Sequence, residues 1–87
     1  MLDAKIVGKV IQKYREEKGL SQEVLSGLAG IGRSHLSAIE RGERRPTLDT
    51  FFKIGEALDI GPSILMSAIE IEIREQEKDT DPKAPQY

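Results

Sequence analysis

Apolar residues recur along the chain with the spacing of amphipathic helices. In the first segment they fall one and three positions apart, on one face of a helix: Ile6, Val7, Val10, Ile11 and Tyr14. Asp3 precedes this face as a suitable N-cap, and Gly19 follows it as a common C-terminal residue. Because no stretch alternates apolar and polar residues with period two, the pattern predicts an all-α protein.

Three shorter helices are expected next. Ser21 is a suitable N-cap for a second helix that ends at Gly30, and a third helix ends at Gly42. Thr47 is the N-cap expected for a fourth helix, whose apolar residues are Leu48, Phe51, Phe52, Ile54 and Leu58. The short connections predict that these helices pack directly against one another.

A fifth helix is expected from Pro62, a residue favoured at the first helical position, to Gln76. The remaining sequence EKDTDPKAPQY contains two prolines and has no apolar period. The pattern therefore predicts one folded domain over residues 1–76 and a disordered tail over 77–87.

The fifth helix has more apolar residues than one core face requires. We expect part of them to close the core, namely Ile64, Leu65 and Ala68. The others are three and four positions apart and form a second stripe: Met66, Ile69 and Ile73. An exposed aliphatic stripe usually marks an interface, so these three residues are the expected dimer contact, with Ile71 at its edge. The alternative is that the helix packs lengthwise on the first helix and buries the stripe.

Charge is divided unevenly along the chain. The formal net charge is −2, but residues 1–47 contain nine Lys and Arg against six Asp and Glu, whereas residues 48–87 contain four against nine. This asymmetry favours one basic binding face, as in nucleic-acid-binding proteins. There is no cysteine and no apolar run of the roughly 20 residues needed to span a membrane, so we expect a cytoplasmic protein without disulfides.

The second and third helices, over about residues 21–41, have the arrangement of a helix-turn-helix. Gly30 can take the left-handed conformation required at the bend, and the small Ser26 allows the two helices to approach closely. Arg41, Arg44 and Arg45 follow the second helix of the motif, where DNA phosphates could be neutralised.

A longer frame strengthens this interpretation. It runs Gly8-x-x-Ile11, Arg15-x-x-x-Gly19-Leu20-Ser21-Gln22-Glu23, Ala29-Gly30-Ile31-x-Arg33-Ser34-x-Leu36-Ser37-x-Ile39-Glu40-Arg41-Gly42, and then Arg45-Pro46-Thr47-Leu48-Asp49-Thr50 and Ile54-x-x-Ala57-Leu58. This frame resembles the phage repressor/Cro-type (lambda-repressor-like) helix-turn-helix family. The resemblance implies a compact five-helix domain that binds operator DNA as a dimer, with the second helix of the motif in the major groove.

The resemblance also implies roles for individual residues. Base edges would be contacted by Gly32, Arg33, Ser34, Ser37 and Ala38. The DNA backbone would be contacted by Gln22, Arg41, Gly42, Arg44 and Arg45. From its own position on the third helix, and not from the resemblance, His35 is expected to contact a phosphate or to remain exposed. Arg15 and Glu40 would form an ion pair between the first and third helices. Gly32 stands where the family usually has a capping side chain.

Simpler interpretations stay open for several of these residues. Arg33 could pair with Glu40 or Glu43 on the surface, and Gln22 could be only a helix former. Arg44 and Arg45 could lie in a solvated loop. His35 and Ser34 are neighbours on a helix and therefore point apart, so we expect no catalytic pair and no enzyme activity.

The sequence therefore predicts a transcriptional regulator that acts as a homodimer on a palindromic operator. No cofactor or metal is expected, and a regulatory partner protein is an open possibility. The alternative is an antitoxin that regulates its own gene through the same domain and binds a toxin through its acidic C-terminal region, which includes Glu70, Glu72, Glu75 and Glu77.

Overall fold

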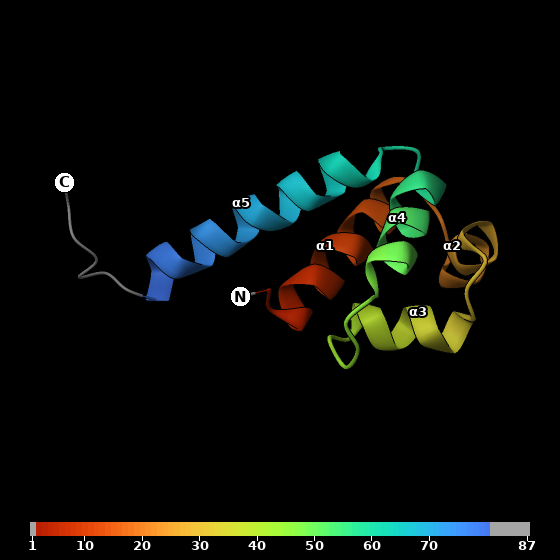
Figure 1. Ribbon diagram of the computed structural model, residues 1–87, viewed down its shortest axis with the longest axis horizontal. Coiled ribbons are helices and arrows are strands. Elements are labelled where there is room, and N and C mark those ends of the chain that lie inside the picture. Colours follow the sequence, from red (N-terminus) through yellow and green to blue (C-terminus); the bar gives the residue numbers. More distant parts are fainter. Residues whose placement is uncertain (1, 81–87) are drawn as a thin grey trace.

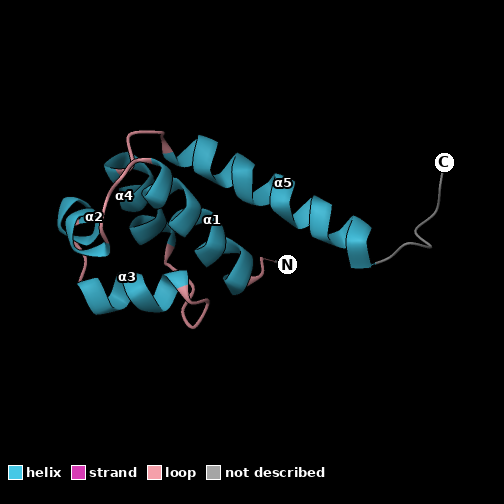
Figure 2. Ribbon diagram, turned by 180° about the vertical axis from the view of Figure 1, so that it is seen from behind, coloured by secondary structure: helices cyan, strands magenta, loops and turns pink. Residues whose placement is uncertain are grey.

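The computed structural model describes residues 2–80 (Figures 1 and 2). These residues form five helices and contain no strand. The helices are α1 (Ala4–Glu17), α2 (Gln22–Ala29), α3 (Arg33–Glu40), α4 (Leu48–Ala57) and α5 (Pro62–Thr80). The predicted all-α, five-helix fold is confirmed.

Three of the predicted N-caps make the expected hydrogen bond. The side chain of Asp3 accepts from the backbone N–H of Lys5, Ser21 accepts from Val24, and Thr47 accepts from Thr50, with distances of 2.8, 3.1 and 3.1 Å. These bonds satisfy backbone donors that have no partner within their own helix. Gly30 ends α2 in the left-handed conformation, at a φ of 69°. The turn before α3 thus has the predicted geometry.

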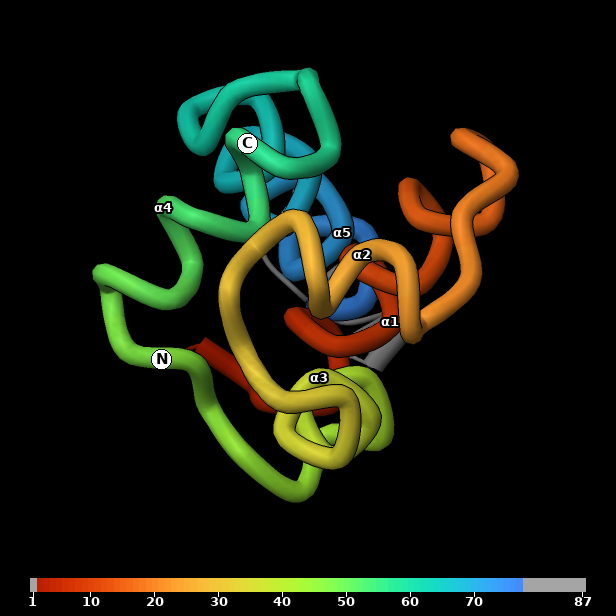
Figure 3. The backbone as a smooth tube through the Cα atoms, turned by 90° about the vertical axis from the view of Figure 1, so that its right-hand side faces the viewer, coloured from red at the N-terminus to blue at the C-terminus, as the bar shows by residue number. Residues whose placement is uncertain are grey.

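The helices pack around one core. Helix α1 lies between α3 and α5, whereas α2 contacts α3 and α4, and α4 contacts α5 (Figure 1). The fully buried side chains come from all five helices and the end of α4: Ile11, Leu25, Leu36, Ile39, Ile54, Leu58, Leu65 and Ile69. Seen along its axis in Figure 3, α3 lies at the outer edge of the molecule. This position leaves one face of α3 free for contact with a ligand.

Two glycines allow the closest helix approaches. A Cβ atom at Gly8 on α1 would lie 2.6 Å from the Glu40 carbonyl oxygen, and one at Gly55 on α4 would lie 2.7 Å from the Cα atom of Pro62. Both distances are below any ordinary contact, so the α1–α3 and α4–α5 contacts require glycine at these positions.

The end of α5 differs from the prediction. We expected the helix to end at Gln76, with a disordered tail over 77–87, but α5 continues to Thr80. Acidic residues at 75 and 77 do not interrupt the helix, because glutamate is a good helix former and no proline occurs between Pro62 and Pro82. The rest of the predicted tail, 81–87, lies outside the described residues.

The two apolar sets of α5 were assigned in part to the wrong sides. Ile69 was expected on an exposed stripe, but its side chain is completely buried in the core. Ile64 was expected to close the core, yet it is 54% exposed. Met66 stays on the surface, and Ile73 packs against the edge of the core. The alternative interpretation, in which α5 packs lengthwise on α1, is correct for Ile69.

Candidate nucleic-acid interface

The start of α2 and the exposed face of α3 form one shallow hollow. It is lined by Gln22, Arg33, Ser34 and Ser37. Sequence analysis had assigned all four residues to DNA contacts, and the fold brings them together from two helices. A hollow of this kind, lined only by hydrogen-bonding and cationic side chains, is suited to a polar, anionic ligand.

Arg33 begins α3 and is exposed. Neither of the carboxylates suggested as its partners is available, since Glu40 pairs with Arg15 and Glu43 pairs with Arg41. Among the side chains that the structure describes, over residues 2–77, none forms a hydrogen bond or ion pair with Arg33. Its guanidinium is therefore free to contact a ligand, and the surface-pair interpretation is wrong.

The first turn of α3 has no side-chain cap. Gly32 is the N-cap residue, and it makes no side-chain capping hydrogen bond. Ser34 is exposed, whereas Ala38 and His35 are partly buried. His35 and Ala38 therefore offer less of their surface to a ligand than Ser34 does.

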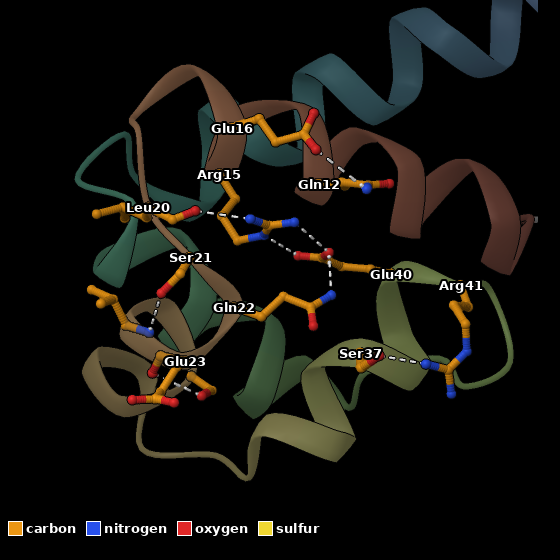
Figure 4. A network of polar contacts seen from close by, with 12 residues as sticks. Gln12, Arg15, Glu16, Leu20, Ser21, Gln22, Glu23, Ser37, Glu40 and Arg41 are labelled. Carbon is orange, nitrogen blue, oxygen red and sulfur yellow. Dashed lines mark hydrogen bonds and ion pairs between the residues drawn. The ribbon is translucent and has the colours of Figure 1, made fainter.

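A buried ion pair ties α3 to α1, as the family resemblance implied. Arg15 donates from Nε and Nη2 to the two carboxylate oxygens of Glu40, at 2.7 and 3.0 Å, and from Nη1 to the Leu20 carbonyl oxygen at 2.8 Å (Figure 4). The hydrogen bonds to Glu40 raise the pKa of Arg15, so its guanidinium stays charged. The pair joins the end of α1, the loop before α2 and the end of α3, and so fixes the angle at which α3 is presented.

Gln22 is connected to the same network. Its side-chain Nε2 donates to Glu40 Oε1 at 2.9 Å (Figure 4). The amide keeps a second N–H and its oxygen for other partners. Gln22 is therefore held in place at the hollow by a buried carboxylate, a contact that sequence analysis did not identify because the two residues are 18 positions apart.

The residues after α3 form a cationic loop. Arg44 and Arg45 are exposed, and Arg45 donates to the Leu2 carbonyl oxygen at 3.3 Å. Gly42 has a φ of 77°, and a Cβ atom there would lie 2.7 Å from Lys5, so this position also requires glycine. The loop thus turns tightly against the start of α1 and displays its arginines beside α3.

Arg41 is paired in a way that sequence analysis missed. Its Nε and Nη2 donate to the two carboxylate oxygens of Glu43 at 2.9 and 3.0 Å, and its Nη1 donates to Ser37 Oγ. The hydrogen bonds from Arg41, and then its positive charge, lower the pKa of the Glu43 carboxyl group. The spacing of two residues between Arg41 and Glu43 was a signal that could have suggested the pair.

Among the described residues, no group of three or more His, Asp or Glu is placed to hold a metal ion. None of the helices described between residues 2 and 80 has the length and apolar character that a membrane span requires.

Comparison with known proteins shows which family the chain resembles. The family described as helix-turn-helix matches residues 11–65. The uncharacterized HTH-type transcriptional regulator y4dJ of Sinorhizobium fredii is 39% identical over 56 residues, which cover 64% of this chain and 73% of that protein.

Solved structures agree over most of the chain. The restriction-modification controller protein C.AhdI from Aeromonas hydrophila is 40% identical, with a TM-score of 0.71 over 75% of this chain and 98% of that one. The controller protein C.Esp1396I, bound to a 25 base pair operator site, is 30% identical, with a TM-score of 0.77 over 84% of this chain and 96% of that one. C.Esp1396I has also been solved as a tetramer in complex with its natural 35 base-pair operator. Because the match to the family covers more than half of this chain, the chain belongs to the helix-turn-helix family of transcriptional regulators.

Proposed function

We propose that this protein binds operator DNA sequence-specifically, with α3 in the major groove and the start of α2 against the phosphate backbone. The observation that carries the proposal is the hollow lined by Gln22, Arg33, Ser34 and Ser37, beside a loop of exposed arginines. A helix with one free polar face fits the width of the major groove. The operator complex of the similar protein C.Esp1396I supports this assignment.

Base edges and backbone are contacted by different residues in this proposal. Arg33 reads a base pair, because its unpaired guanidinium can bind guanine O6 and N7 together. Ser34 and Ser37 offer single hydrogen bonds, while Gly32 and Ala38 allow close approach or contact a thymine methyl group. The residues proposed to contact the DNA backbone are Gln22, His35, Arg41, Gly42, Arg44 and Arg45.

We further propose that the functional unit is a homodimer on a palindromic operator. Two recognition helices separated by one turn of DNA, about 34 Å, read two equivalent half-sites, which requires a two-fold symmetric interface. The tetramer of the similar protein C.Esp1396I supports self-association.

The candidate interface is an apolar groove next to α5, with Ile69 at its base. Exposed apolar side chains surround it, and Leu48 is 79% exposed. The groove is lined by Leu2, Val7, Arg45, Pro46, Leu48, Phe51, Met66 and Ile69. The groove includes Met66 of the predicted stripe, so the proposed contact lies between the starts of α4 and α5. A second copy of the chain is the proposed occupant.

The antitoxin alternative gains no support from the relatives described above, which are transcriptional regulators and controller proteins. The acidic residues on which it depended lie on α5, where Glu70 pairs with Arg74 at 2.9 Å.

The experiment is a salt titration of binding to DNA selected from a random pool. Replacing both Arg44 and Arg45 with alanine should flatten the slope of log K against log salt concentration by about two, since each phosphate contact releases about one counterion. The control replaces Lys53 and Arg74, two cations on α4 and α5 that pair with Asp49 and Glu70. It removes the same charge and should leave the slope unchanged. Equal slopes for all three proteins would contradict the proposed backbone contact.

A further inference from the structure

Ser37 on α3 is connected to the loop by a chain of hydrogen bonds. The carboxylate of Glu43 accepts from Nε and Nη2 of Arg41, and Nη1 of Arg41 donates to Ser37 Oγ (Figure 4 shows the last contact). Ser37 and Arg41 are four residues apart, and Arg41 is the C-cap of α3. Ser37 also lines the hollow with Gln22 and Arg33. This series of hydrogen bonds therefore ends on the face of α3 that is proposed to contact DNA bases.

The direction of each hydrogen bond in this series is fixed by the groups that take part. A guanidinium has five N–H donors and no acceptor, so Ser37 Oγ can only accept from Arg41. The hydroxyl proton of Ser37 is left without an acceptor among the described residues. A hydroxyl that accepts from a cation becomes a better donor and a poorer second acceptor. Ser37 is thus prepared to donate to a ligand rather than to accept from it.

We propose that Arg41 is a positioning residue that sets the base preference of Ser37, and that Glu43 holds Arg41 in place for this role. This inference rests on the proposed DNA binding by α3. In the major groove, guanine presents O6 and N7, adenine presents N7 and thymine presents O4 as acceptors, whereas cytosine presents only the N4 donor. Ser37 therefore selects a base with an acceptor and disfavours cytosine on the strand that it contacts.

This role is distinct from a phosphate contact by Arg41. A phosphate contact changes affinity by the same factor for every DNA sequence and lowers the salt slope. Control of Ser37 instead changes the preference at one base pair of each half-site. Arg41 uses three of its five N–H groups on Glu43 and Ser37, so two remain for a phosphate. The experiment must therefore measure preference separately from affinity.

The experiment selects bound DNA from a random pool with the wild type and with three variants, and then measures affinity for the four bases at each half-site position. Ser37→Ala identifies the position that Ser37 reads. At that position Arg41→Met should reduce the discrimination against cytosine by roughly 3- to 10-fold, the value of one hydrogen bond. Arg44→Met is the matched control, because it removes the same charge from the same exposed loop without contacting Ser37. It should weaken binding to all sequences equally and leave the preference unchanged.

Three outcomes overturn parts of this account separately. If Ser37→Ala changes no position, or if Arg41→Met behaves as Arg44→Met does, the inference is wrong while sequence-specific binding stands. If the wild type selects no sequence at all, the proposed function itself fails. Circular dichroism of each variant checks that the helices are retained, which we expect because both arginines are exposed.

Discussion

Gly8 on α1 lies directly against the backbone of Ile39 near the end of α3. A Cβ atom at Gly8 would overlap the Ile39 carbonyl oxygen and lie 2.6 Å from that of Glu40. The contact involves backbone atoms, which cannot turn aside as a long side chain could. The distance between α1 and α3 is therefore set by the absence of a side chain at Gly8.

The Gly8→Ala variant should lose about 2–3 kcal/mol of unfolding free energy, because the two helices must move apart. Urea denaturation followed by circular dichroism measures the loss. Gly27→Ala is the matched control: Gly27 lies within α2 and no atom would meet its Cβ within 4 Å. That variant should gain roughly 0.5–1 kcal/mol through helix propensity. A Gly8→Ala protein as stable as the wild type would contradict the close contact.

The Arg15–Glu40 pair should show strong energetic coupling. Their side chains are only 10% and 2% exposed, so removing one partner leaves a buried charge without compensation and should cost about 3–5 kcal/mol. In a double-mutant cycle with Arg15→Gln and Glu40→Gln, we expect a coupling energy of about 1–3 kcal/mol. Strictly additive losses of unfolding free energy would mean that the pair contributes nothing in solution.

Arg33 should contribute to sequence recognition more than to general affinity. Replacing it with alanine should weaken binding to the selected operator by about 1–3 kcal/mol and change binding to random DNA far less, because a fork-shaped contact to guanine is lost. Fluorescence anisotropy with both DNAs provides the comparison. Equal losses on the two DNAs would reassign Arg33 to the backbone.

The proposed dimer contact can be tested by placing charge on one flank of α5 at a time. Replacing Leu48 and Met66 with lysine should produce a folded monomer, because both side chains lie on the surface of the single chain and the charge enters only the proposed interface. Sedimentation velocity measures whether the variant is a monomer or a dimer.

The matched control replaces Ile64 and Ile71 with lysine. Their side chains are 54% and 56% exposed. Ile71 borders α1 rather than α4, beside Tyr14. This control should stay dimeric. A monomeric control together with a dimeric Leu48 and Met66 variant would move the interface to the α1 side of α5.

The pair of Arg41 and Glu43 predicts a specific pH dependence. Hydrogen bonds from Arg41 lower the pKa of Glu43, so its carboxyl group should titrate below the ordinary glutamate range in carbon-detected NMR. A lowered folded-state pKa gives stabilisation that is present above the unfolded value and is lost as the pH falls through the folded value. Arg41→Met should return the midpoint to the ordinary range. An unchanged midpoint would show that the two side chains separate in solution.

Much of the fold was predictable because its signals are local. The caps Asp3, Ser21 and Thr47 act within three residues, and Gly30 supplies its conformation at a single position. The apolar period of each helix needs no knowledge of distant residues. The site residues were gathered from the sequence through the family frame, and the structure brings four of them into one hollow.

Only the tertiary structure decided which apolar residues of α5 are covered. Ile64 and Ile69 are chemically identical, and both fit a helical stripe, but the placement of α1 and α4 buries Ile69 and leaves Ile64 at the surface. The partner of Gln22 also depended on folding, because Glu40 reaches it from another helix, 18 positions along the chain. Periodicity determines where a helix forms, whereas the partners of its side chains depend on the positions of other segments, because packing acts between residues that are distant in sequence.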